Sequence, residues 1–191
     1  MTKKANQFQL KISLKGSKPA IWRRVIVDSD LLLEDVHYLV QAVMPWCDCH
    51  MHQFIHNKTY YGPAEDVSDS FIDLIDYSEK KLSDLIASEK DTLLYEYDFG
   101  DSWEHTILLE KILPPTDSES RAEYVKGKNA APPEDCGGIY GYAHLLNVLK
   151  DPKTADCSDM RDWMGLEDGE EFDPTDIGFD EDELNDELYG I

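Results

Sequence analysis

The chain has 191 residues and a formal net charge of −22, from 18 basic and 40 acidic side chains. Its hydrophobic fraction of 41% is high enough for a folded core and argues against a disordered protein. So acidic a surface repels phosphates, which argues against direct nucleic-acid binding, and no apolar run approaches the roughly 18 residues that a membrane span needs.

The first half of the chain predicts a hairpin, a helix and a third strand. Apolar and polar residues alternate over residues 8–14, and β-branched and aromatic residues follow over 21–27, so we expect two paired strands. The cluster 28–30 is typical of a helix start, and apolar residues at helical spacing predict a helix that ends before Pro45. The next extended run is 50–57.

The second half predicts another hairpin and several helices. A short helix is expected over 78–86, strands over 93–99 and 103–109, a short strand near 121–124, and helices over 142–149, 155–164 and 181–189. This order indicates an α+β fold with a largely antiparallel sheet. We predict an α+β domain over residues 1–150 and an acidic helical extension over 151–191, either packed on that domain or partly mobile.

Two cysteines and two histidines lie within six residues, at Cys47, Cys49, His50 and His52. The N-terminus has no apolar signal segment, so we expect a cytoplasmic protein with reduced thiols. The spacing of the cysteines is not that of a structural zinc site, and we interpret them as incidental.

The two histidines offer a better metal site. On a strand both imidazoles project from one face, so His50 and His52 could bind one divalent metal. The third ligand would be Asp98, Asp101 or His105. The alternative is that the histidines are hydrogen-bonded structural residues on a half-buried face.

The second hairpin carries an Asp-Phe-Gly triplet at 98–100. The other kinase motifs are missing, so we interpret the triplet as a tight turn. His105 shares an apolar strand face with Trp103, which favours a hydrogen-bonded core histidine over a metal ligand. Asp98 faces the other way and belongs either to a solvated face or to an acid–base site.

Four segments together resemble one family. They are Ile21-Trp-Arg-Arg24, His50-Met-His-Gln-Phe54, Tyr95-Glu-Tyr-Asp-Phe-Gly-Asp-Ser-Trp-Glu-His105, and Pro132-Pro-Glu-Asp-Cys-Gly-Gly138 with Gly141-Tyr142 downstream. Their order resembles the plasmid pRiA4b ORF-3-like family, whose members are described as passenger proteins of plasmids and insertion elements. The resemblance spans about residues 8–149 and implies no established activity. Cys47 and Cys49 lie outside the family pattern.

The leading functional hypothesis is a binding or interaction module with one concave patch. Its predicted members are Trp22, Arg23, Arg24, Tyr97, Asp98, Asp101, Trp103 and Cys136. Adjacent strand residues face opposite ways, so only one of the two arginines can join the patch. That arginine would bridge acidic side chains or hold an anionic ligand.

Two alternatives stay open. In a metal-dependent hydrolase, His50, His52 and one of Asp98, Asp101 or His105 would bind the metal, and Glu104 or Glu134 would act as base. In an accessory protein of a mobile genetic element, the acidic C-terminal segment would dock to a basic protein partner.

Overall fold

The computed structural model describes residues 4–67, 73–150, 153, 155–167 and 170–188. Within these residues one sheet of eight strands runs in the order β5-β4-β3-β6-β7-β1-β2-β8. Its pairs are antiparallel except for β4 and β5, which are parallel. The strands are β1 (Gln7–Leu14), β2 (Trp22–Asp28), β3 (His52–His56), β4 (Thr59–Gly62), β5 (Leu74–Asp76), β6 (Thr92–Tyr97), β7 (Trp103–Leu113) and β8 (Ala122–Lys128).

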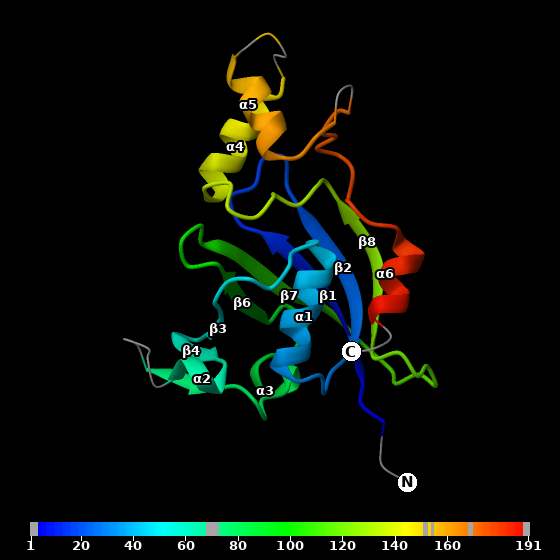
Figure 1. Ribbon diagram of the computed structural model, residues 1–191. Coiled ribbons are helices and arrows are strands. Elements are labelled where there is room, and N and C mark those ends of the chain that lie inside the picture. The colour runs from blue at the N-terminus through cyan, green and yellow to red at the C-terminus, as the bar shows by residue number, and fades with distance from the viewer. Residues whose placement is uncertain (1–3, 68–72, 151–152, 154, 168–169, 189–191) are drawn as a thin grey trace.

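The helices lie on one face of the sheet and at its ends (Figure 1). They are α1 (Leu33–Val43), α2 (Ala64–Val67), α3 (Leu82–Leu85), α4 (Gly138–Val148), α5 (Ala155–Trp163) and α6 (Glu181–Leu188). The predicted α+β fold with a largely antiparallel sheet is therefore confirmed. No helix in the described part of the chain is long and apolar enough to cross a membrane.

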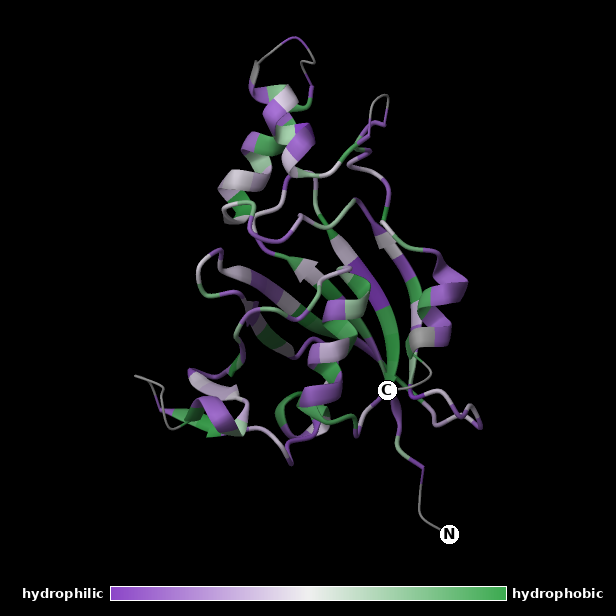
Figure 2. Cartoon of the chain, viewed as in Figure 1, coloured by the Kyte–Doolittle hydropathy of each residue, from purple (hydrophilic) through white to green (hydrophobic). Residues whose placement is uncertain are grey.

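The core fills the space between the sheet and α1. On β1, Phe8, Leu10, Ile12 and Leu14 are all buried, because alternate residues of a strand face the same side. Helix α1 turns its apolar stripe toward them, because its buried apolar residues recur at helical spacing, and its ribbon in Figure 2 carries both hydrophobic and hydrophilic residues. The carboxylate of Asp35 accepts the backbone N–H of Leu32 at 3.2 Å and so holds the start of α1.

Several boundaries differ from those expected. Helix α1 begins at Leu33 rather than at the cluster 28–30, because Asp28 still belongs to β2. Strand β3 begins at His52, helix α4 begins at Gly138, and β8 runs on to Lys128. The elements β4, α2 and β5 were not predicted, since they are short.

The acidic C-terminal segment packs against the rest of the chain. Leu184 and Leu188 of α6 are buried in the same hydrophobic cluster as the sheet and α1. Helix α6 lies beside β8, where the Asn185 side-chain oxygen accepts the backbone N–H of Tyr124 at 2.7 Å (Figure 1).

Arg23 connects several separate segments of the chain through hydrogen bonds in the protein interior. Its guanidinium is fully buried and donates to the carbonyl oxygens of Val43, Asn129 and Ile177, among others. The expectation that an arginine of this strand would hold an anionic ligand is therefore wrong for Arg23. Burial leaves it no access to a ligand, and desolvation lowers its pKa.

Candidate functional site: the loop junction

Three connecting segments meet beside the amino-terminal end of β3. They are the loop 44–51 after α1, the turn 98–102 between β6 and β7, and the loop 129–137 before α4. We call this region the loop junction. The Trp46 indole N–H donates to the carbonyl oxygen of Pro132 at 2.9 Å. The backbone N–H of Asp98 donates to the carbonyl oxygen of Met51, also at 2.9 Å. These bonds hold the three segments in one arrangement.

The backbone of the junction has an unusual conformation at several positions. Asp98 and Asp135 have φ angles of 56° and 58°, in the left-handed region that Asp and Asn tolerate better than most residues. Gly138 has φ 67°, and a Cβ there would lie 2.5 Å from the carbonyl oxygen of Asp101. Such conformations persist when the surroundings enforce them, and they gather at functional sites.

His50, Asp98 and Asp135 form the first cluster of the junction. The His50 Nε2 atom lies 3.3 Å from Asp135 Oδ1 and 3.9 Å from Asp98 Oδ2. The other oxygen of Asp98 accepts the backbone N–H of Gly100 at 2.9 Å, which fixes the carboxylate. One donor atom from each of the three residues lies within 4.8 Å of the others.

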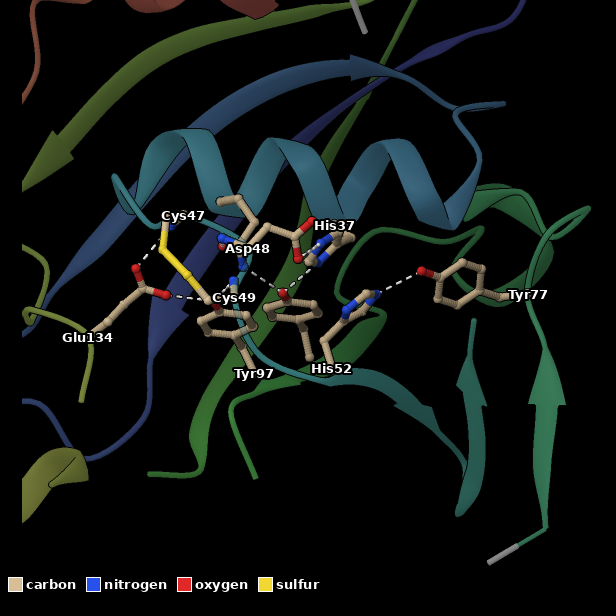
Figure 3. Close-up of polar contacts among 10 residues, drawn as sticks. His37, Cys47, Asp48, Cys49, His52, Tyr77, Tyr97 and Glu134 are labelled. Atoms are coloured by element: carbon tan, nitrogen blue, oxygen red, sulfur yellow. Dashed lines mark hydrogen bonds and ion pairs between the residues drawn. A yellow bond between two sulfur atoms is a disulfide. The ribbon is translucent and has the colours of Figure 1, made fainter. Parts of the chain in front are cut away.

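A hydrogen-bonded chain runs from α1 into the loop (Figure 3). The Gln41 side-chain oxygen accepts the backbone N–H of Asp48, so its amide nitrogen donates to Tyr95 Oη at 3.1 Å. Tyr95 can then donate to His37 Nδ1 at 2.8 Å, and His37 Nε2–H donates to Asp48 Oδ1 at 2.9 Å. This sequence of donors assigns the proton of the neutral His37 ring to Nε2.

His52 is stacked on His37. The two imidazole rings are 3.5 Å apart and inclined by 6°, and His52 Nε2 lies 2.7 Å from Tyr77 Oη (Figure 3). Burial lowers the pKa of His37 to about 4 and that of His52 to about 3. Both rings are therefore uncharged at neutral pH.

A cleft of about 330 Å³ opens beside these rings. Among the described residues its lining includes His37, His50 and His52 together with Glu34 and Glu65, and contains neither lysine nor arginine. Because the buried imidazoles are neutral, the fixed charge around the cleft comes from carboxylates. The cleft therefore presents a negative potential to any ligand.

Cys47 and Cys49 form a disulfide at the rim of the junction. The prediction that these two residues are reduced is therefore wrong. Both cysteines are exposed, and Glu134 lies beside them, accepting the backbone N–H of Cys47 at 3.0 Å and the hydroxyl of Tyr97 at 2.5 Å (Figure 3). Desolvation and the bond to Glu134 raise the pKa of Tyr97.

Not all the predicted site residues meet at the junction. Trp22 and Arg24 lie on the opposite face of the sheet, where Arg24 pairs with Glu110 at 2.6 Å. Glu104 is also on that face and pairs with Lys15 at 2.6 Å. The expectation of a single concave patch is therefore wrong, because the strand alternation divides its members between two faces.

The remaining predicted residues lie at or under the junction. Trp103 and His105 are buried, and desolvation lowers the pKa of His105 to about 3. The carboxylate of Asp101 accepts the backbone N–H of Gly137 at 3.0 Å, which is a structural contact. Cys136 is half-buried, and burial raises the pKa of its thiol to about 12, so the thiolate is scarce at neutral pH.

The histidine pair is divided between two clusters. Among the described residues, no set of three donors within 4.8 Å of one another contains both His50 and His52. Strand β3 begins only at His52, so the strand rule that would place both imidazoles on one face does not extend to His50.

Sequence reasoning missed His37, Asp48 and Asp135. His37 is a histidine on the apolar face of α1, which is a detectable signal. Asp135 sits in the Glu-Asp-Cys segment used for the family resemblance. Their contacts with residues 11 to 85 positions away follow from the tertiary fold alone.

Comparisons with known proteins agree with this architecture. The chain matches the family described as plasmid pRiA4b ORF-3-like protein over residues 6–182. It is 32% identical over 169 residues to "Uncharacterized protein y4hQ" of Sinorhizobium fredii (strain NBRC 101917 / NGR234), covering 86% of this chain and 84% of that protein. The crystal structure of protein of unknown function MM3350 from Methanosarcina mazei Go1 is similar, with a TM-score of 0.79 and 38% identity over 94% of this chain and 98% of that one. The chain thus belongs to the plasmid pRiA4b ORF-3-like family.

Proposed function

We propose that this protein is a binding module for a divalent cation, which His50, Asp98 and Asp135 hold at the loop junction. The observation that carries the proposal is the convergence of one imidazole nitrogen and two carboxylate oxygens from three separate segments within 4.8 Å. An imidazole suits Zn²⁺ and carboxylates suit Mn²⁺, so this mixed set favours these two ions.

The distances support coordination after a small adjustment. Donors about 2.1 Å from one ion, at tetrahedral or octahedral angles, are about 3.0–3.5 Å apart. The observed separations from His50 Nε2 are 3.3 Å and 3.9 Å, and the donor atoms of Asp98 and Asp135 lie within 4.8 Å of each other, so coordination needs shifts of about 1 Å. The Gly100 amide orients Asp98 as an outer hydrogen bond orients a metal ligand.

The charge of the cluster also favours a cation. Asp98 is buried, and within the described part of the chain no lysine or arginine forms an ion pair with it. Two carboxylates that approach the same imidazole repel each other, and a divalent ion between them relieves this repulsion. The acidic cleft beside the junction raises the local concentration of cations.

The neighbouring cluster of His37, Asp48 and His52 is less suited to an ion. Imidazole lone pairs lie in the ring plane, and these two rings are parallel at 3.5 Å. One ion cannot lie in both planes unless a ring turns. In addition, the Nε2 atom of His37 donates its proton to Asp48, so this nitrogen has no lone pair free to bind an ion.

The proposal is tested by calorimetric titration of metal-free protein with Mn²⁺ and Zn²⁺. We expect one equivalent to bind, and His50→Ala or Asp135→Asn to weaken binding at least about 10-fold. His144→Ala, at an exposed histidine on α4, is the surface control, and His52→Asn tests the neighbouring cluster. Circular dichroism confirms that each variant is folded.

Two results would contradict the proposal. One is an unchanged affinity for the metal in both His50→Ala and Asp135→Asn, which would show that the ion does not bind to this cluster. The other is loss of binding in folded His52→Asn alone, which would move the ion to the stacked histidines.

A further inference from the structure

The Cys47–Cys49 disulfide closes too short a loop to stabilise the fold by much. A disulfide stabilises a fold by closing a loop, and the effect grows with the length of that loop. Here the sequence separation is 2, so the closed loop is about as short as it can be. Both cysteines are exposed, and exposed disulfides are the more readily exchanged ones.

A carboxylate lies next to the sulfur atoms. One carboxylate oxygen of Glu134 and the two Sγ atoms lie within 4.8 Å of one another. Glu134 is held in place by the backbone N–H of Cys47 at 3.0 Å and by the Tyr97 hydroxyl at 2.5 Å. Tyr97 in turn accepts the backbone N–H of Cys49 at 3.0 Å. The carboxylate is thus fixed beside the disulfide by bonds that start at both of its cysteines.

We propose that Cys47, Cys49 and Glu134 form a dithiol–disulfide exchange centre, in which the disulfide takes two electrons from a dithiol and Glu134 carries protons to and from the sulfur atoms. The proposed cation site uses none of these three residues, although its ligands His50 and Asp135 directly follow Cys49 and Glu134 in the chain.

The exchange balances in two steps. A thiolate of the dithiol attacks one protein sulfur, so a mixed disulfide forms, the Cys47–Cys49 bond breaks and the other cysteine leaves as a thiolate. The second thiol of the substrate, once deprotonated, attacks the substrate sulfur of the mixed disulfide and releases the second cysteine. Two protons pass from the substrate thiols to the protein thiols, with Glu134 as the relay. The products are a substrate disulfide and the reduced protein.

The centre is tested in full-length protein that carries Cys136→Ser and Cys157→Ser, which removes the two free cysteines. The protein is equilibrated in graded glutathione redox buffers with a chelator, and its thiols are alkylated and counted by mass spectrometry. We expect a reversible change between no and two alkylated thiols per chain. The rate of reduction by dithiothreitol should fall at least about 10-fold in Glu134→Gln, while the equilibrium midpoint stays within about 3-fold.

The matched control is Glu104→Gln, an exposed carboxylate on the opposite face of the sheet, which should leave both values unchanged. The proposal is overturned by thiols that stay reduced in excess oxidised glutathione, or by a disulfide that excess dithiothreitol does not open. Equal reduction rates in Glu134→Gln and the parent would overturn the role of Glu134. Because a chelator is present throughout, failure here says nothing about the cation site.

Discussion

Acid should destabilise this protein well above the pH at which its carboxylates titrate. His37, His52 and His105 are buried, and desolvation lowers their pKa values from 6.5 to about 4, about 3 and about 3. The unfolded chain binds a proton at each of them near the ordinary pKa, whereas the folded chain does not. Their contribution to stability is therefore complete above pH 6.5 and is lost as the pH falls toward the folded pKa values.

The size of the effect follows from the number of protons. Each histidine that protonates only in the unfolded state costs about 1.4 kcal/mol per pH unit once the pH is below its unfolded pKa. Between about pH 7 and about pH 5.5, three such residues together remove about 3 to 4 kcal/mol from the free energy of unfolding. That is a large part of the roughly 5–15 kcal/mol that stabilises a typical domain.

Urea denaturation followed by tryptophan fluorescence measures this dependence across that pH range. His52→Gln should reduce the slope of unfolding free energy against pH by about one third, because one of three protons is removed. His144→Gln, at an exposed position on α4, should leave the slope unchanged. An unfolding free energy that is flat from about pH 7 to about pH 5.5, or a slope that His52→Gln does not alter, would refute the reasoning.

Three further predictions concern single contacts. Arg23→Leu should lower the free energy of unfolding by about 3 kcal/mol or more in urea denaturation, because several buried carbonyl oxygens lose their donor; a loss no larger than that of Arg24→Leu would contradict this. The bonds from Arg24, more than any other contact, lower the pKa of Glu110 to about 2. An NMR titration of Arg24→Gln should show that pKa rising toward 4.5, and an unchanged value would show that other groups hold it down. Gly138→Ala should lower the melting temperature by several degrees, since its Cβ would meet the Asp101 carbonyl oxygen at 2.5 Å; an unchanged melting temperature would mean that the loop yields.

The regular elements could be predicted because their sequences are periodic. Strand β1 alternates over its length and α1 repeats apolar residues at helical spacing, and both were placed within a few residues. Strand β5 has three residues and pairs only through β4, so its conformation depends on a neighbour that the sequence does not identify. The register of β1 between β7 and β2 likewise depends on contacts between distant residues.

The site was harder to predict than the fold. Two of the proposed ligands, His50 and Asp98, were among the predicted metal ligands, whereas Asp135 was not. A local strand rule paired His50 with His52, but the strand begins at His52, two residues too late for that rule to hold. The disulfide was missed because the expected compartment alone was used to infer the state of the two cysteines, and the loop geometry that brings their sulfur atoms together could not be read from the sequence.

Helix α6 has a consequence for how molecules of this protein behave toward one another. Strand β8 stands at the end of the strand order, and such an edge offers unpaired amides to another chain. The side-chain oxygen of Asn185 accepts the backbone N–H of Tyr124 on that side. The first turn of α6 carries the acidic residues Glu181, Asp182 and Glu183. Helix α6 thus covers part of the β8 edge and sets acidic side chains beside it, so we expect it to disfavour edge-to-edge pairing between molecules of this protein.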